Sequence, residues 1–289
     1  MKLKDLIVSS KFILPEVENT LRKYGAVVIP SYINVDHLCK LQEEWEAIYH
    51  QRTQEGIEYL TRVGGDVADY VLLNRRKLGN EQFPFINKIF SDRNFFRLAN
   101  RVVGHPYCLN EEVYATYDIG RDSEIAASHF DKTWNLKFMI YLHDITEIGW
   151  GAFGVHPGTQ SLGREIFRKW FDRCGINNVV EVGSPAYYQM GNDIIPTDLP
   201  ECIDIFAPAG TLIIFGTDIF HRAGFLSKGN ERKILRGHTA PGYFSLRAGY
   251  RIKRYSRQWL RAEPWEINNK PYHRFSTRGF LNFFQEKIG

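Results

Sequence analysis

The stretch Gly210-Thr-Leu-Ile-Ile-Phe-Gly-Thr-Asp-Ile-Phe-His221 contains a short apolar run that ends a few residues before a histidine. The run from Gly210 to Phe215 is rich in β-branched and aromatic side chains and is bounded by glycine, which predicts a buried strand. His221 then lies just past this strand. Arg232 follows eleven residues later and leads into a second β-rich run, Ile234 to Phe244. This part of the chain therefore predicts two strands, one preceding a histidine and one carrying an arginine.

A second histidine, His129, lies far upstream and is followed two positions later by Asp131. In an extended segment, residues i and i+2 project from the same face, so this imidazole and this carboxylate can bind one metal ion. With 9 histidines and 33 acidic residues in 289 positions, about one such spacing is expected by chance, and the pair alone is weak evidence. Together with His221, however, it supplies the two histidines and one carboxylate of the non-haem Fe(II) facial triad.

The composition is that of a soluble globular protein, with 44% hydrophobic, 14% aromatic and 24% charged residues. The four cysteines are scattered without a C-x-x-C pattern, which argues against a disulfide framework or a zinc site and favours a reducing compartment. The N-terminal apolar run is too short for a signal peptide, and no stretch approaches the length of a membrane span. We therefore expect a cytoplasmic protein with no membrane partner.

The net charge of +4 is mildly basic and is not by itself a nucleic-acid signature. The excess lies near the C-terminus, among aromatic residues but without a recognised RNA- or DNA-binding motif, so we expect no nucleic-acid partner. A charge run of this kind is usually a solvated face, and the alternative is a rim that attracts an anionic substrate. The basic residues concerned are Arg247, Arg251, Lys253, Arg254, Arg257 and Arg261.

The chain has no repeat or obvious linker, which predicts one domain spanning 1–289. It would comprise a helical N-terminal region to about residue 105, a β-rich core from about 107 to 245, and a basic extension over 246–289. Short β-rich runs separated by Gly, Pro and Asn or Asp favour a sandwich or barrel. The expected helices are 38–49, 84–103 and 161–174, and the expected strands are 25–29, 112–117, 136–142, 151–155, 211–215 and 234–244.

Four blocks occur in an order typical of one enzyme family. They are Ser128-His-Phe-Asp131, Met139-Ile-Tyr-Leu-His-Asp-Ile-Thr146, Gly151-Ala-Phe-Gly-Val-His-Pro-Gly-Thr-Gln160, and the stretch from Gly210 through His221 to Arg232-Lys-Ile-Leu235. In these blocks the chain resembles the phytanoyl-CoA dioxygenase family of Fe(II)/2-oxoglutarate-dependent oxygenases. The resemblance covers most of residues 20–245. It implies a mainly β fold with flanking helices and a double-stranded β-helix core, also called a jelly roll or cupin-like fold.

The same resemblance assigns roles to particular residues. It makes His129, Asp131 and His221 the iron ligands and the catalytic centre, and it makes Arg232 the partner of the distal carboxylate of 2-oxoglutarate. A planar guanidinium can hold a carboxylate through two parallel hydrogen bonds. Arg236 is the rival for this role, because it would share a strand face with Arg232.

The chain departs from the family pattern at three positions. Gln160 replaces the usual histidine, Trp150 occupies a turn normally built from Asn and Gly, and Ala223 stands where many members have a small hydroxyl residue near the co-substrate. Another group must then complete the co-substrate site, and the candidates are Tyr141, Thr217, Tyr114 and Tyr117. We expect the two remaining histidines, His156 and His238, to be hydrogen-bonded structural residues.

The resemblance implies an enzyme that uses Fe(II), 2-oxoglutarate and O₂ to oxidise a C–H bond of a small molecule, releasing succinate and CO₂. The presence of Asp131 favours hydroxylation over halogenation. Arg75, Arg76, Arg251 and Arg254 are candidates for holding an anionic substrate, on charge alone. Two alternatives are a cupin-type metal enzyme that does not use 2-oxoglutarate and a non-catalytic binding module. The substrate and the oligomeric state do not follow from the sequence.

Overall fold

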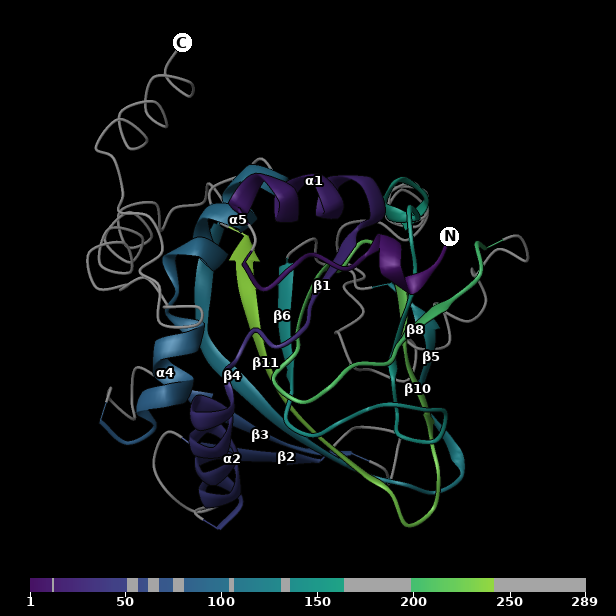
Figure 1. Cartoon of the computed structure of the whole chain (residues 1–289). Coiled ribbons are helices and arrows are strands. Elements are labelled where there is room, and N and C mark those ends of the chain that lie inside the picture. The colour runs from purple at the N-terminus through teal and green to yellow at the C-terminus, as the bar shows by residue number, and fades with distance from the viewer. Residues whose placement is uncertain are drawn as a thin grey trace, which may run out of the picture.

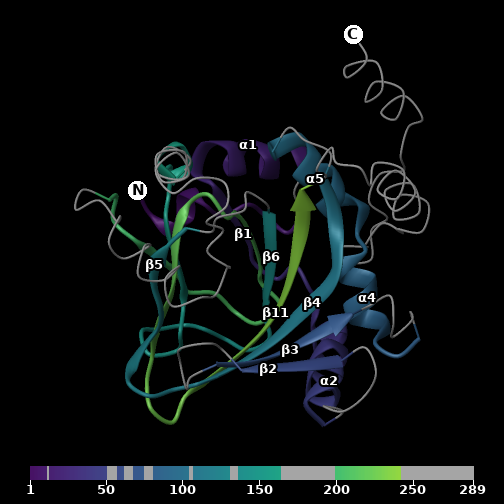
Figure 2. The same ribbon diagram turned by 180° about the vertical axis from the view of Figure 1, so that it is seen from behind.

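The computed structural model describes residues 1–11, 13–50, 57–61, 68–74, 81–103, 107–130, 136–163 and 199–241. In these ranges two antiparallel β-sheets face each other, and helices cover the other side of the larger sheet (Figures 1 and 2). This arrangement confirms the mainly β, jelly-roll core that the sequence predicts. The described helices include none that is both long enough and apolar enough to cross a membrane.

The larger sheet has seven strands in the part of the chain that the structure describes. Their spatial order is β1 (Ala26–Ile29), β9 (Leu212–Gly216), β6 (Leu136–Tyr141), β11 (Glu231–Pro241), β4 (Tyr107–Ile119), β3 (Ala68–Asn74) and β2 (Ile57–Thr61). Side chains alternate across this sheet, so that Ile234 faces the smaller sheet and Leu235 faces the helices. The region up to about residue 105, which the sequence predicts to be helical, also contains β2 and β3. These two strands are not predicted from the sequence, and they extend the sheet beyond β4.

The smaller sheet contains four described strands in the order β5 (Ser123–His129), β10 (Phe220–Leu226), β7 (Phe153–His156) and β8 (Ile203–Ile205). Two of the crossings between the sheets, at residues 120–122 and 227–230, lie together at one end of the molecule, which we call the hairpin end. Gly120 allows this crossing, because a Cβ there would lie 1.8 Å from the Ser227 carbonyl oxygen. The opposite end, where β5 stops at His129 and β10 begins, is called the histidine end.

Helices α1 (Leu14–Tyr24), α2 (Val35–His50), α4 (Pro84–Phe90) and α5 (Arg93–Val103) accompany a short 3-10 helix, η1 (Leu3–Asp5). The helix expected over 38–49 is confirmed as part of α2, and its Leu41, Trp45 and Ile48 are buried against the larger sheet. The helix predicted over 84–103 is instead two helices. The break falls at Asp92, whose Oδ1 accepts a hydrogen bond of 2.8 Å from the Asn94 amide and so caps α5.

A second core fills the space between the two sheets. Met139, Phe215 and Ile234 from the larger sheet meet Phe153 and Val155 from the smaller one. The candidate site lies in this interior. The predicted basic extension over 246–289 and most of the predicted helix over 161–174 lie outside the described residues.

Candidate metal centre

His129 and His221 are brought together by strand pairing. They are direct partners in the ladder between β5 and β10, and their ring centroids lie 4.5 Å apart. His129 is the last residue of β5 and His221 is the second residue of β10. Two residues that are far apart in sequence therefore present their imidazoles from adjacent strands of one sheet.

Both imidazoles are held in the same tautomer. The Nδ1 atom of His129 lies 2.7 Å from the Ala127 carbonyl oxygen, and Nδ1 of His221 lies 2.9 Å from the Ile219 carbonyl oxygen. A carbonyl oxygen can only accept, so each Nδ1 carries the proton and donates it. Each Nε2 then keeps a lone pair for a metal ion, which is how metal-binding histidines are usually oriented.

The His221 ring lies deep between the sheets. Its exposure is 3%, and its centroid is 5.0 Å from that of Phe215 and 5.7 Å from that of Phe153. An apolar surround of this kind limits solvent access to a bound metal ion.

The predicted carboxylate ligand, Asp131, lies outside the described residues, two positions after His129. Across the residues that the structure does describe, no group of three metal-binding side chains occurs. The imidazole pair is thus the described part of the centre, and the role of Asp131 stays a prediction.

Arg232 is buried in the same interior, nearer the hairpin end. Its Nε and Nη2 donate to Oδ2 of Asp118 at 2.8 Å and 2.6 Å, and its Nη1 donates to the Gly151 carbonyl oxygen at 2.9 Å. The two side chains are 3% and 0% exposed. These contacts use three of the five N–H groups of the guanidinium and leave two for a carboxylate.

Asp118 is a residue that sequence reasoning missed. It is the ladder partner of Arg232 across β4 and β11, so it projects from the same face of the larger sheet. A buried arginine without a counter-ion would be very unfavourable, and Asp118 supplies that charge. The one available signal was the alternation along β4, but the register that sets Asp118 opposite Arg232 cannot be read from the sequence.

Several of the residues between the levels of the histidine pair and Arg232 are small. Ala223 lies two positions after His221 on β10, and its ladder partners are Ala126 and Phe153. Gly151 pairs with β10 further along, through its amide and the Phe225 carbonyl oxygen. A Cβ at Gly151 would lie 3.2 Å from Cδ of Arg232. Ala223, Ala126 and Gly151 thus add little side-chain bulk between the histidine pair and the guanidinium, whereas Phe153 contributes a large ring.

Arg236, the rival arginine, occupies a different level of the same face. His238 pairs with Lys137, and Lys137 pairs with Phe215, whose ring centroid lies 5.0 Å from that of His221. His238 is therefore at the level of the histidine pair, and Arg236 is one inward-facing position from it. Arg232 lies two further inward-facing positions toward the hairpin end. This order favours Arg232 as the partner of the distal carboxylate, since that carboxylate is the end of the co-substrate farther from the metal.

Tyr141 was a candidate for the co-substrate site, but its hydroxyl is already used. It donates to the Ile205 carbonyl oxygen at 3.1 Å and accepts from the Phe153 amide at 2.9 Å. Burial raises the pKa of Tyr141, so the hydroxyl keeps its proton. Tyr141 therefore ties the larger sheet to β7 and β8 and has no proton left for a carboxylate.

The other candidate hydroxyls are divided between the two faces. Tyr117 lies on the helix side, where it donates to Glu231 at 2.5 Å and packs on Trp45, so it does not line the interior. Tyr114 faces the interior and stacks on His238 with centroids 4.7 Å apart. Thr217 is buried in the turn between β9 and β10, four positions before His221, and its role stays a prediction.

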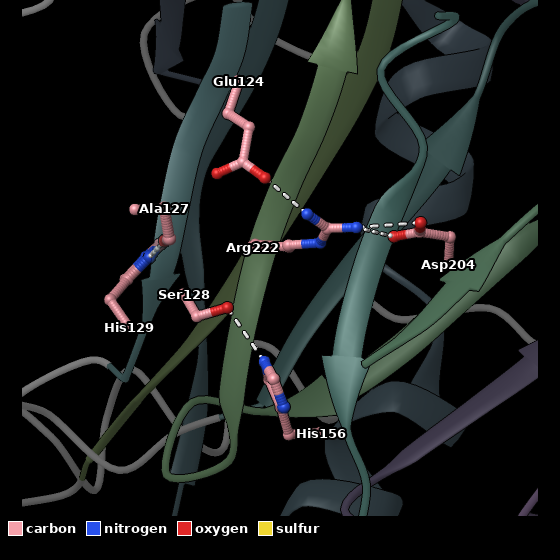
Figure 3. Close-up of polar contacts among 7 residues, drawn as sticks. All are labelled: Glu124, Ala127, Ser128, His129, His156, Asp204 and Arg222. Atoms are coloured by element: carbon pink, nitrogen blue, oxygen red, sulfur yellow. Dashed lines mark hydrogen bonds and ion pairs between the residues drawn. The ribbon is translucent and has the colours of Figure 1, made fainter. Parts of the chain in front are cut away.

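His156 is a structural histidine, as predicted. Its Nδ1 is 2.6 Å from the Pro200 carbonyl oxygen and its Nε2 is 2.8 Å from the Ser128 hydroxyl (Figure 3). Gln160, which replaces the family's usual histidine, contacts the Leu21 and Arg22 carbonyl oxygens of α1 at 3.4 and 3.3 Å. Arg75, Arg76, Arg251 and Arg254 lie outside the described residues.

A cavity of about 370 Å³ lies near α2, away from the histidine pair. Its floor includes Lys233, whose Nζ contacts Glu46 and Glu231 at 2.9 Å and lies 5.2 Å from the Trp45 ring centroid. These residues belong to the helix side of the larger sheet, so this cavity is separate from the interior that contains His129 and His221.

No family model matches this sequence, and no curated protein sequence matches it. Several solved structures are similar. The non-haem alpha-ketoglutarate-dependent epimerase SnoN, from nogalamycin biosynthesis, is 16% identical with a TM-score of 0.55, over 79% of this chain and 82% of SnoN. HygX from Streptomyces hygroscopicus, solved with nickel and 2-oxoglutarate, is 15% identical with a TM-score of 0.53, over 81% and 89%.

The non-haem alpha-ketoglutarate-dependent carbocyclase SnoK, also from nogalamycin biosynthesis, is 15% identical with a TM-score of 0.57. The similarity covers 93% of this chain and 96% of SnoK, so it extends over nearly the whole of both proteins. At these identities the likeness concerns the fold, and the chain shares the fold of SnoN, HygX and SnoK.

Proposed function

We propose that this protein is a non-haem Fe(II)- and 2-oxoglutarate-dependent dioxygenase that oxidises, and in the simplest case hydroxylates, a C–H bond of a small molecule. The observation that carries the proposal is the pair of cross-strand imidazoles, His129 and His221, whose Nδ1–H groups donate to backbone carbonyl oxygens, so that Nε2 is the nitrogen of each ring that can coordinate a metal ion. Arg232 lines the same interior and is suited to a dicarboxylate.

The donor set fits a divalent iron ion. His129, His221 and Asp131 would hold it, which is the two-histidine, one-carboxylate set of such enzymes. When bound, the iron supplies the O₂-dependent oxidation that converts 2-oxoglutarate to succinate and CO₂. The chain itself orients both imidazoles through the Ala127 and Ile219 carbonyl oxygens and keeps the centre apolar.

Arg232 would bind the distal carboxylate of 2-oxoglutarate. Its Nε and Nη2 are held by Asp118, so the edge formed by Nη1 and Nη2 is presented in a fixed orientation. Low exposure strengthens such a charge-assisted contact, because little water competes for it. The Gly151 carbonyl oxygen supports the guanidinium from the smaller sheet.

We further propose that the substrate is anionic. Lys137, Arg236 and His238 share the inward face of the larger sheet at the histidine end. Nζ of Lys137 is 5.8 Å from the Phe215 ring centroid, and Phe215 in turn contacts His221. These basic groups favour a substrate carrying a carboxylate, phosphate or sulfate near the carbon that is oxidised.

The similar structures support the proposed use of a metal ion and 2-oxoglutarate with a small-molecule substrate. One structure of SnoN contains Fe3+, alpha-ketoglutarate and nogalamycin RO, and one of HygX contains nickel, 2-oxoglutarate and hygromycin B. These are small-molecule ligands in enzymes with the same fold.

The decisive experiment needs no substrate. Under anaerobic conditions, Fe(II) and then 2-oxoglutarate are added to the protein, and the visible spectrum is recorded. We expect a weak charge-transfer band that requires both additions. It should be lost in Arg232→Gln and kept in Arg101→Gln, which removes an exposed arginine paired with Glu18.

The alternatives predict other results. A cupin-type enzyme that does not use 2-oxoglutarate would bind metal but give no band, and a non-catalytic module would bind no metal. Loss of the band in Arg236→Gln, with retention in Arg232→Gln, would transfer the carboxylate role to Arg236.

A further inference from the structure

Among the described strands of the smaller sheet, β5, which carries His129, is an outer one, and its pairing with β10 is interrupted. In the ladder with β10, His129 faces His221 and Ala126 faces Ala223. Ala127 and Ser128 on β5 thus stand opposite the single residue Arg222. This is a β-bulge placed immediately before the metal ligand, and a bulge disrupts the ladder hydrogen bonds that would otherwise set the position of His129.

A hydrogen bond across the sheet compensates for the bulge. The Ser128 hydroxyl lies 2.8 Å from Nε2 of His156, which belongs to β7 on the far side of β10 (Figure 3). Because Nδ1 of His156 is 2.6 Å from the Pro200 carbonyl oxygen, it carries the proton, and Nε2 accepts from Ser128. His156 is 7% exposed, so its ring is itself firmly packed.

A second contact holds β5 from the same outer side. The Arg222 guanidinium pairs with Glu124 of β5 and, at 2.8 and 2.9 Å, with both carboxylate oxygens of Asp204 of β8, as Figure 3 shows. The arginine passes over Gly154, where a Cβ would lie 2.8 Å from its Cγ. All four strands are therefore tied together on the face opposite to the imidazole pair.

We propose that Ser128 and His156 are positioning residues of the metal centre, and that their hydrogen bond sets the bulge of β5 so that the His129 imidazole faces His221. This inference rests on the proposed function, since it concerns the same metal. Ser128 points away from the interior and acts through the backbone of the next residue. His156 is the fixed acceptor to which that backbone is tied.

The test compares metal affinity among serine variants of one strand. The dissociation constant for Mn²⁺, a redox-stable probe for the Fe(II) site, is measured by calorimetry for the wild type, Ser128→Ala, Ser128→Thr and Ser123→Ala. Ser123→Ala is the matched control, because it removes the same hydroxyl from the other end of β5, away from the bulge. Melting temperatures of the metal-free proteins are recorded alongside.

We expect Ser128→Ala to weaken Mn²⁺ binding about 10-fold, in the range found when groups that orient metal ligands are removed. Ser128→Thr, which keeps the hydroxyl, should restore most of the affinity, and Ser123→Ala should bind like the wild type. Wild-type affinity in Ser128→Ala would overturn the inference while leaving the proposed function intact. Equal weakening in Ser128→Ala and Ser123→Ala would also overturn it, by showing a general loss of stability. A wild-type protein that binds no Mn²⁺ and no Fe(II) would overturn both.

Discussion

At the scale of single residues, the buried hydroxyl of Tyr141 both donates and accepts within the interior. It donates to the Ile205 carbonyl and accepts from the Phe153 amide, both on the opposite sheet. We expect Tyr141→Phe to lower the free energy of unfolding by about 2 kcal/mol, since two buried backbone groups lose their partner. Chemical denaturation measures this change. The affinity for 2-oxoglutarate should stay within twofold, and a loss of tenfold or more would reinstate Tyr141 as a co-substrate residue.

His143 predicts a pH dependence. Burial is the main cause that lowers its pKa below the ordinary value of 6.5, and its Nε2 accepts the Lys233 amide at 3.2 Å, which requires the neutral ring. The unfolded chain therefore binds the proton more readily than the folded one. The stabilisation is complete above pH 6.5 and is lost as the pH falls below that value.

Unfolding curves at pH 7.5 and 5.5 check this. The wild type should lose more stability between the two values than His143→Gln, which keeps an acceptor but does not titrate. Equal losses would show that other groups cause the acid sensitivity.

At the scale of elements, α4 depends on a cap from another helix. Its N-cap residue, Phe83, has no capping side chain, but Glu44 of α2 accepts the Phe85 and Ile86 amides at 2.9 and 2.8 Å. Two charge-assisted hydrogen bonds thus join α2 to α4. Glu44→Ala should cost about 2 kcal/mol of unfolding free energy, measured by denaturant titration. Glu43→Ala, which removes an exposed carboxylate one position earlier, should cost less than about 0.5 kcal/mol.

At the scale of the whole molecule, the proposed ligands bridge the two sheets. The metal would be held by β5 and β10 of the smaller sheet, and the distal carboxylate of 2-oxoglutarate by Arg232 of the larger one. Binding to the folded state alone raises stability, by about 2.7 kcal/mol at a ligand concentration of 100 times Kd. Mn²⁺ should therefore raise the melting temperature, and 2-oxoglutarate should raise it further.

Thermal unfolding with metal alone and with both ligands checks this prediction. The second increment should disappear in Arg232→Gln, whereas the first should be unchanged. If both increments persist, Arg232 does not link the co-substrate to the larger sheet.

The fold class was predictable from the sequence, whereas the roles of the site residues stay predictions. Short runs rich in β-branched and aromatic residues predicted the strands around Leu212 and Ile234. The four ordered blocks predicted that His129 and His221 share one site, and the structure pairs these two residues across β5 and β10. These signals are local because strand preference and side-chain alternation depend on near neighbours. The break between α4 and α5 was also encoded locally, in the capping residue Asp92, although it was read as one continuous helix.

Tertiary structure alone decided which residues meet. The pairing of Arg232 with Asp118, the strands β2 and β3 beside β4, and the hydrogen bond between Ser128 and His156 all follow from strand register. A shift of one residue in strand register would turn the Arg232, Asp118, Ser128 or His156 side chain to the other face of its sheet. No local sequence pattern specifies the register. The sequence by itself therefore determined the fold class and the set of residues that are candidates for binding a metal ion and 2-oxoglutarate. The register of long-range strand pairs determined the counter-ion of Arg232, the structural use of Tyr141 and the support behind His129.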